Sequence, residues 1–64
     1  MYFKLIGEMF KSKITIRKLA DFLGIDRNTM GKKLKGKAFL TVEEAQKIRD
    51  NFFPDIALDV LLQK

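Results

Sequence analysis

The stretch from Ile14 to Lys37 constrains the fold most, because it holds the clearest helix start and stop signals in the chain. Its first half spaces apolar residues at i, i+3, i+4 and i+7, which places them on one face of a helix. These residues are Ile16, Leu19, Ala20 and Leu23. Gly24 follows directly, where a residue in the left-handed conformation ends a helix most easily. We therefore expect a helix over residues 16–23 with Thr15 as its N-cap.

A second helix is predicted directly after a tight turn. Asp26 suits the N-cap of that helix and the positive end of its dipole. Met30 and Leu34 form an i, i+4 apolar pair, and Gly36 ends the helix. The other positions are polar or small: Arg27, Asn28, Gly31, Lys32, Lys33 and Lys35. Two short helices joined in this way, the second rich in Arg, Asn and Lys, indicate a helix-turn-helix at about residues 15–36.

Composition excludes several classes of function. The chain has 64 residues and contains neither cysteine nor histidine, so it lacks disulfides, thiolate metal ligands and the commonest general base. A catalytic site would need paired carboxylates, and the acids at 21 and 26 and at 43 and 44 fit helix caps and solvated faces better. We therefore expect no enzyme activity, no catalytic residue, no cofactor, no metal and no small-molecule ligand.

A core this small is packed most economically by helices with local contacts. We expect an all-α fold, a compact bundle of about five short helices forming the single domain 1–64. A helix over residues 2–12 should bury Phe3, Ile6, Met9 and Phe10 on one face, with Leu5 beside them. Phe22 falls off the main apolar stripe of the following helix and should cover the first helix or lie partly exposed.

The C-terminal third carries two further helices. Thr41 and Glu44 form a capping box, so a helix should run from there to about Asn51, with Val42, Ala45 and Ile48 as its inner stripe and Phe52 extending it. Of Phe39 and Leu40, at most one needs to be buried, and local packing is the favoured role of Phe39 over contact with a thymine methyl or a partner subunit. Pro54 separates this helix from a last one over residues 55–63.

That last helix has more apolar surface than a short helix needs to pack on the core. It is either a lid on the core or a homodimer seam, with Ile56, Val60, Leu61 and Leu62 as the candidate interface residues. Tyr2, at the other end of the chain, should pack on the core at the helix end rather than contact a partner.

Charge is unevenly distributed along the chain. Residues 1–40 contain ten basic and three acidic residues, a net +7, whereas residues 41–64 contain three basic and five acidic residues, a net −2. A basic face of this kind suits a polyanion, although a solvated lysine-rich surface is the simpler alternative. No apolar run approaches the roughly 20 residues that span a bilayer, and Lys4 and Glu8 argue against a signal peptide. We expect a soluble intracellular protein with no membrane partner.

The helix over residues 27–35 is predicted to be the recognition helix that contacts base edges in the major groove. Arg27 can donate to guanine and Asn28 can pair with the adenine edge, with Lys32 one turn further on the same exposed face. Lys35 and Lys37 are predicted phosphate contacts, since they flank Gly36 at the end of the helix. Further candidates for phosphate contact are Arg17, Lys18, Thr29 and Lys33; Thr29 could equally cap or pack, and Arg17 and Lys18 could simply be solvated.

The chain resembles the lambda-repressor-like, XRE-type helix-turn-helix domains of phage repressors and Cro proteins. The resemblance rests on the pattern I-T-x-x-x-L-A-x-x-L-G-I-D-R-N-T-M-x-x-x-L-x-G across residues 14–36, and continues more loosely through residues 40–48 and 52–54. In particular it resembles short single-domain regulators encoded by phages and prophages of Gram-positive bacteria. Two positions depart from the family pattern: Ile16 stands where many members have Gln, and Lys33 where many have an apolar residue.

The resemblance implies a five-helix fold, sequence-specific binding to double-stranded DNA as a homodimer on an inverted-repeat operator, and control of transcription in the cytoplasm of a bacterial or phage-infected cell. Base contacts then fall to Arg27, Asn28 and Lys32, and a phosphate contact to Lys35, whereas none is carried over to Ile16. The alternative is a protein-binding module, an antirepressor or adaptor, that keeps the helix-turn-helix fold without reading DNA. RNA binding is disfavoured because no aromatic platform for stacking bases is apparent.

Overall fold

Five α-helices and no strand make up the computed structural model, which describes residues 1–64. An all-α fold is therefore confirmed. None of the helices combines the length and the apolar character that crossing a bilayer demands. In chain order they are α1 (Phe3–Lys11), α2 (Ile16–Leu23), α3 (Arg27–Lys35), α4 (Val42–Phe52) and α5 (Leu58–Leu61).

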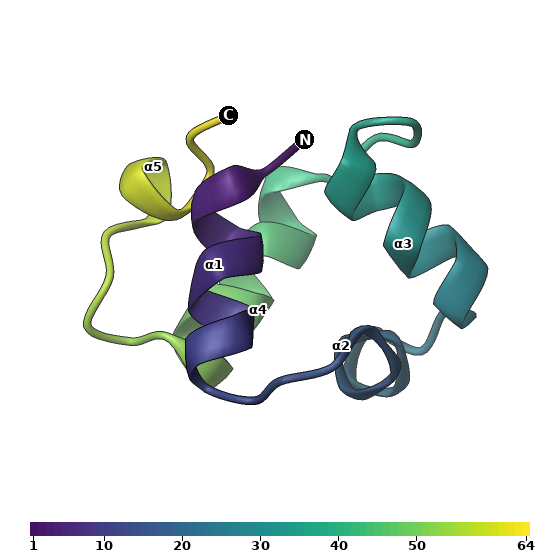
Figure 1. The fold of residues 1–64 in the computed structure, drawn as a ribbon, viewed down its shortest axis with the longest axis horizontal. Coiled ribbons are helices and arrows are strands. Elements are labelled where there is room, and N and C mark those ends of the chain that lie inside the picture. Colours follow the sequence, from purple (N-terminus) through teal and green to yellow (C-terminus); the bar gives the residue numbers. More distant parts are fainter.

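The helices enclose one core in a molecule of 26 × 20 × 20 Å. The helix α2 packs mainly on α3, whereas α5 packs against α1 and α4. Figure 1 shows α1 in front of α4, with α2 and α3 on the opposite side of the molecule from α5. The two termini lie at the same end, where the Lys64 ammonium sits 5.3 Å from the centre of the Tyr2 ring. Tyr2 is half-buried against the core, as expected.

Three predicted N-caps are present, and each begins a helix at the expected residue. The Thr15 hydroxyl accepts a hydrogen bond from the Lys18 amide at 3.1 Å. The Asp26 carboxylate accepts one from the Thr29 amide at 2.8 Å. In the capping box of α4, the Thr41 side chain and the Glu44 side chain each accept a backbone amide of the other residue at 3.0 Å. These bonds satisfy amides that would otherwise lack partners in the first turn.

The predicted helix ends at Gly24 and Gly36 are also confirmed. Both glycines adopt left-handed backbone angles, with φ of 73° and 80°. A side chain is disfavoured in this conformation, so glycine can end α2 and α3 without strain. The chain between the two helices is consequently a turn of only three residues, 24–26.

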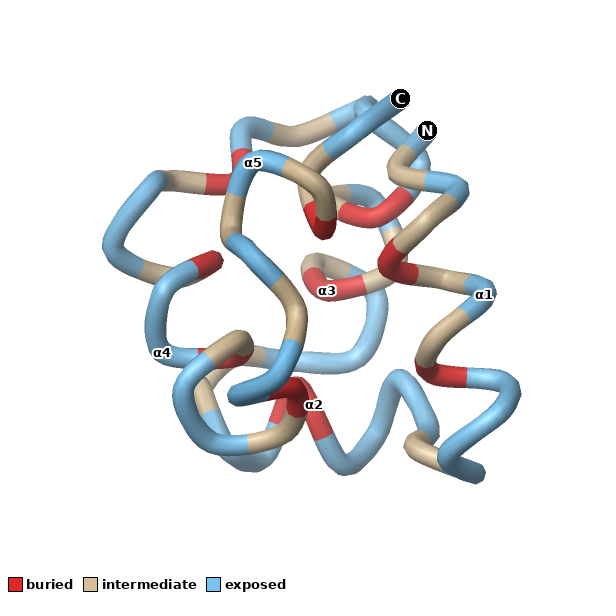
Figure 2. Tube along the Cα trace, turned by 90° about the vertical axis from the view of Figure 1, so that its left-hand side faces the viewer, coloured by how far each residue is buried: buried red, intermediate tan, exposed pale blue.

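The buried residues come from every helix and meet in the centre of the molecule (Figure 2). They include most of the predicted inner positions. No polar or charged residue is buried. The complete core is Leu5, Met9, Leu19, Ala20, Met30, Leu34, Leu40, Ala45, Ile48, Phe53 and Leu61.

The predicted inner face of α1 is confirmed for Met9, and Ile6 is half-buried against the core, but the prediction is wrong for both phenylalanines. Leu5 and Met9 are buried, whereas Phe3 is 66% exposed and Phe10 is 86% exposed. The Tyr2 amide donates a hydrogen bond to the Leu34 carbonyl at 3.0 Å, which fixes the start of α1 against the end of α3. Along the rest of α1, Leu5 and Met9 face the core and both phenylalanines face solvent.

Three apolar side chains farther along the chain also differ from expectation, and a fourth, Phe22, agrees with it. Ile16 and Val42 are 40% and 64% exposed because each is the first residue of its helix, where the chain still lies at the surface. Phe22, expected on the first helix or partly exposed, is partly exposed and packs on Phe52 of α4, with the rings edge to face and their centres 5.1 Å apart. Phe39, for which local packing was favoured, is 76% exposed, whereas its neighbour Leu40 is buried.

The last helix is shorter than predicted, because it covers four residues rather than 55–63. The Arg49 guanidinium accounts for part of the difference: its Nε donates to the Ile56 carbonyl at 3.0 Å and its Nη2 to the Pro54 carbonyl at 3.4 Å. These contacts hold residues 54–56 in an irregular turn before α5 begins. Leu61 is completely buried, so it belongs to the core and cannot contribute to a dimer seam.

Candidate nucleic-acid interface

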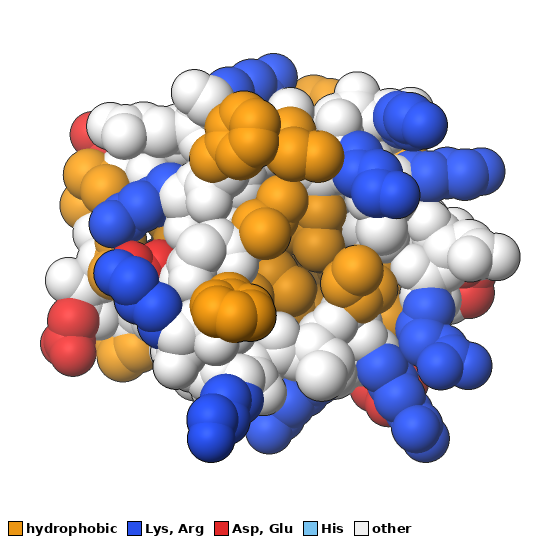
Figure 3. All heavy atoms as spheres, in the orientation of Figure 1, with side chains coloured by type: hydrophobic (Ala, Val, Ile, Leu, Met, Phe, Trp, Pro, Cys, Tyr) orange, Lys and Arg blue, Asp and Glu red, His pale blue; other side chains and the backbone are white.

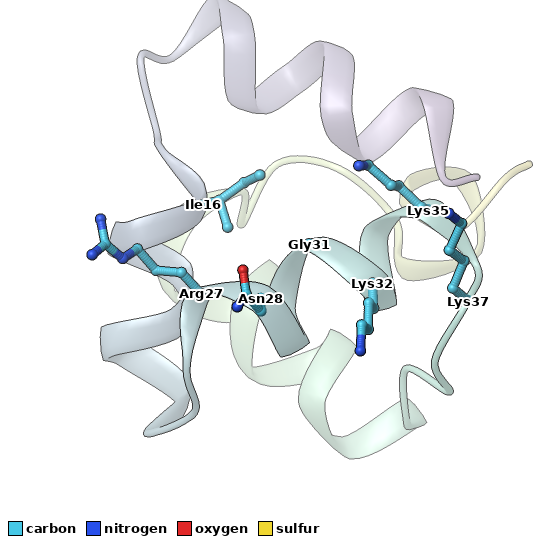
Figure 4. A pocket seen from close by; sticks show the side chains of 7 residues that line it. All are labelled: Ile16, Arg27, Asn28, Gly31, Lys32, Lys35 and Lys37. Carbon is cyan, nitrogen blue, oxygen red and sulfur yellow. The ribbon is translucent and has the colours of Figure 1, made fainter.

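A surface hollow of about 570 Å³ lies along the outer side of α3 (Figure 4). All three predicted base contacts and two predicted phosphate contacts line it. Ile16 at the start of α2 and Gly31 in the middle of α3 complete it. The lining residues are Ile16, Arg27, Asn28, Gly31, Lys32, Lys35 and Lys37.

The packing of α3 explains why these side chains share one surface. Met30 and Leu34 are buried, and a helix repeats every 3.6 residues, so the residues on the opposite side of α3 face outward. The outward set from α3 is Arg27, Asn28, Gly31, Lys32 and Lys35, at spacings i, i+1, i+4, i+5 and i+8. The Asp26 cap fixes the first turn of α3 and therefore the place where Arg27 and Asn28 leave the helix. A second hollow, of about 460 Å³, is lined by Asp26, Arg27 and Asn28 at this same end.

The cations of this surface have no acidic partners. Five ion pairs are present in the structure, and none of them involves Arg27, Lys32, Lys35 or Lys37. All four residues are exposed. Their charges are therefore left uncompensated, which produces a positive potential over the hollow.

Asp26 is the one acidic residue at the edge of the interface. Hydrogen bonds from the backbone amide and then from the hydroxyl of Thr29 hold the pKa of its carboxyl below the ordinary value. The carboxylate thus stays ionised and engaged in the cap of α3. Since the Thr29 hydroxyl donates to Asp26 at 3.0 Å, the side chain of Thr29 acts in the cap rather than on the lining of the hollow.

Lys33 is not on the predicted phosphate-contacting surface. Its ammonium donates to the Phe39 carbonyl at 2.7 Å and to Glu44 Oε1 at 3.0 Å, and its side chain is only 12% exposed. Lys33 follows Met30 by three residues and so falls on the inner side of α3. It ties α3 to the loop at Phe39 and to the capping box of α4, and we remove it from the candidate phosphate contacts.

Arg17 and Lys18 lie apart from the hollow. Both are exposed in the first turn of α2, and neither forms an ion pair. They remain candidates for contacts outside the lining of the hollow. Ile16 beside them is the lining residue that sequence reasoning missed, because its place in the apolar repeat assigned it to the core.

The same surface has an apolar part that the sequence did not indicate. A further hollow, of about 270 Å³, adjoins the basic one and has apolar walls throughout. Lys35 lines both and contributes its carbon stem to the apolar side. The apolar hollow is lined by Met1, Ile6, Met9, Ile16, Gly31, Leu34 and Lys35. Elsewhere on the chain, no three acidic side chains converge to form a cage for a metal ion.

The geometry of this surface is that of a basic helix held by its caps and its buried face, with cations on its outer side. Comparison of the chain with models of protein families, with curated proteins and with solved structures gave no match.

Proposed function

We propose that this chain is a sequence-specific double-stranded DNA-binding regulator in which α2, the turn and α3 form a helix-turn-helix. One observation carries the proposal: the outer side of α3 presents Arg27, Asn28, Lys32 and Lys35 around one hollow, with every cation free of an acidic partner. A surface of this kind attracts a polyanion, and the amide and guanidinium groups within it supply the donors and acceptors that read base edges.

Each side chain has a role that follows from its place on α3. Arg27 and Asn28 lie at the N-terminal end, the part of a recognition helix that contacts base edges in the major groove. Arg27 would donate to guanine and Asn28 would pair with adenine. Lys32 follows one turn later on the same side, and Lys35 and Lys37 would neutralise phosphates at the groove edge.

Gly31 gives this face a flat centre. It lies on the lining between Asn28 and Lys35, and no atom would lie within 4 Å of a Cβ placed there. The glycine is therefore not required by packing within the chain. We assign it to close approach of the α3 backbone to the wall of the groove.

A regulator of this type reads two half-sites with two copies of the chain. We propose a homodimer on an inverted-repeat operator, with its seam on Ile56, Val60 and Leu62, which stay half-buried at the end of the chain. The resemblance to lambda-repressor-like domains supports a role in transcription, of the repressor or Cro kind, in a bacterial or phage-infected cell.

A second candidate is a protein-binding module that keeps this fold without reading DNA. The exposed aromatic rings of Phe3, Phe10 and Phe39 favour it, because a large apolar side chain at the surface often marks a contact site. The two candidates differ in one measurable property: a protein-binding module has no preferred DNA sequence.

Paired substitutions test the assignment of the base contacts. Arg27→Ala should weaken binding to the preferred duplex by about 1–3 kcal/mol and have a much smaller effect on a scrambled duplex. Lys35→Ala should weaken both equally and reduce the slope of log affinity against log salt by about 0.9. Lys47→Ala, on α4 and 3.8 Å from Glu43, is the matched control and should change neither. Equal loss on both duplexes for Arg27→Ala would refute base reading by this residue.

A further inference from the structure

The apolar hollow lies between α1 and α3, on the face shown in Figures 1 and 3. Met9 and Leu34 form its floor, since both are buried, and Ile6 and Ile16 stand at its sides. Figure 3 shows apolar side chains gathered around the centre of this face, with Lys and Arg side chains around them. Nothing in the chain fills the hollow, so an apolar group of a ligand can enter it.

The apolar surface continues from the hollow onto α1. Ile6, Phe3 and Phe10 lie at i, i−3 and i+4, which places them side by side along one strip of the helix. Phe3 and Phe10 are 66% and 86% exposed, and neither belongs to the core. Gly7 lies in the same strip, with no atom within 4 Å of a Cβ position. An exposed apolar strip beside an apolar hollow has the form of a docking site.

The apolar and basic hollows adjoin and share part of their lining. Three residues line both of them: Ile16, Gly31 and Lys35. A ligand that fills the apolar part therefore lies against Lys35 and next to the basic hollow, which Lys32 and Lys37 also line. Charge complementarity then requires that such a ligand carry carboxylates next to its apolar side chains.

We propose that this face docks an acidic amphipathic segment of another protein, which seats an apolar side chain in the hollow and places carboxylates on Lys35 and Lys37. Since the lining is shared, the segment and DNA exclude each other. This exclusion rests on the proposed function. Binding of the segment would release the regulator from its operator.

Other occupants fit the surface less well. A second copy of the chain using the same face would bring together two N-terminal parts that each carry a net +7. A lipid bilayer is planar and could take up Phe3 and Phe10 but would leave the concave part empty. DNA offers phosphates to the basic side but no side chain that fills an apolar hollow.

Selection from a phage-displayed library of random peptides on the immobilised full chain tests the docking step. Enriched peptides should combine Asp or Glu with Leu, Ile or an aromatic residue at helical spacing. The best peptide, synthesised with a fluorescent label, should lose about tenfold or more in affinity with Phe10→Ser, since the docked segment would cover this exposed ring of the strip. Phe39→Ser is the matched control: this ring is also exposed but lies outside α1 and its apolar strip, so peptide affinity should be unchanged.

Competition with a random-sequence duplex at low salt tests exclusion. The duplex should displace the labelled peptide, and Phe10→Ser should leave affinity for the duplex unchanged. Selection of no acidic peptide, equal effects of Phe10→Ser and Phe39→Ser, or binding only to phosphatidylglycerol vesicles would overturn the docking site. A complex with peptide and duplex bound together would overturn exclusion. If the chain binds peptides but no DNA, the docking site is supported and the proposed function is refuted. If the chain binds DNA but selects no acidic peptide, the proposed function is supported and the docking site is refuted.

Discussion

Replacement of Gly31 by alanine should stabilise the fold and weaken DNA binding. Glycine in the interior of a helix is less favourable than alanine by about 0.5–1 kcal/mol, and a Cβ at this position meets no atom within 4 Å. The free energy of unfolding of Gly31→Ala should therefore rise by about that amount. With a urea m value of about 1 kcal/mol/M, the midpoint of unfolding moves up by roughly 0.5–1 M.

The effect on DNA binding should be opposite to the effect on stability: the affinity for DNA should fall. If the α3 backbone approaches the wall of the groove at Gly31, the added methyl group overpacks that contact and costs about 1–3 kcal/mol of binding free energy. Gly7→Ala is the matched control, because Gly7 also lies within a helix with no neighbour at its Cβ position but does not line the basic hollow. It should give the same stabilisation with unchanged DNA affinity.

Urea unfolding followed by far-UV circular dichroism and fluorescence anisotropy with a labelled duplex measure the two effects. Equal DNA affinity of Gly31→Ala and Gly7→Ala would refute close approach of α3 at this residue. Destabilisation by Gly31→Ala alone would refute the finding that the space beside it is open.

The remaining predictions concern the ion pair between α3 and α4. Lys33→Ala should lower the free energy of unfolding by about 1–3 kcal/mol, because Glu44 and the Phe39 carbonyl lose a charged partner. The salt dependence of DNA binding should stay unchanged. A smaller salt slope would show that Lys33 contacts DNA. Burial opposes ionisation of Glu44, but bonds from the Thr41 amide and the Lys33 ammonium outweigh it and hold the pKa below its ordinary value of 4.5. Its stabilisation is therefore present above that value and lost as pH falls through the lowered pKa, so urea unfolding of Glu44→Gln should show a flatter pH dependence in this range. An unchanged pH profile would contradict this role.

The elements that could be predicted from sequence have local causes. The caps at Thr15, Asp26 and Thr41 each act on an amide three residues away, and Gly24 and Gly36 act through their own backbone angles. Each of these signals involves only residues within one helical turn of each other. They placed α2, α3 and the start of α4 at the right residues.

The inward face of α1 could not be predicted from its own residues. The apolar residues of α1 form two overlapping stripes, one with Leu5 and one with both phenylalanines, and the helical repeat allows either to face inward. In the structure the stripe with Leu5 faces inward, and the Tyr2 amide at the start of the helix donates to the carbonyl of Leu34, far along the chain. Likewise, the long side chain of Arg49 reaches the carbonyls at 54 and 56, and no local pattern announces this contact.

The candidate site was predictable on α3 and at Lys37 just after it, but not on α1 and α2. The spacing of Met30 and Leu34 determines which residues of α3 face outward, and it also places Lys33 inside, a consequence that the sequence prediction did not draw. The apolar hollow arises only where α1, α2 and α3 meet, so its lining could not be predicted from a single helix. Ile16 belongs to both hollows for this reason.

Selection of a random-sequence duplex pool with the full chain, followed by titration at two salt concentrations, tests sequence-specific DNA binding most directly. Enrichment of an inverted repeat is the expected result, with log affinity falling against log salt by about 0.9 for each phosphate neutralised. Salt-sensitive binding without enrichment of any sequence would contradict base reading by α3. Absence of binding even at low salt would contradict a DNA-binding function altogether.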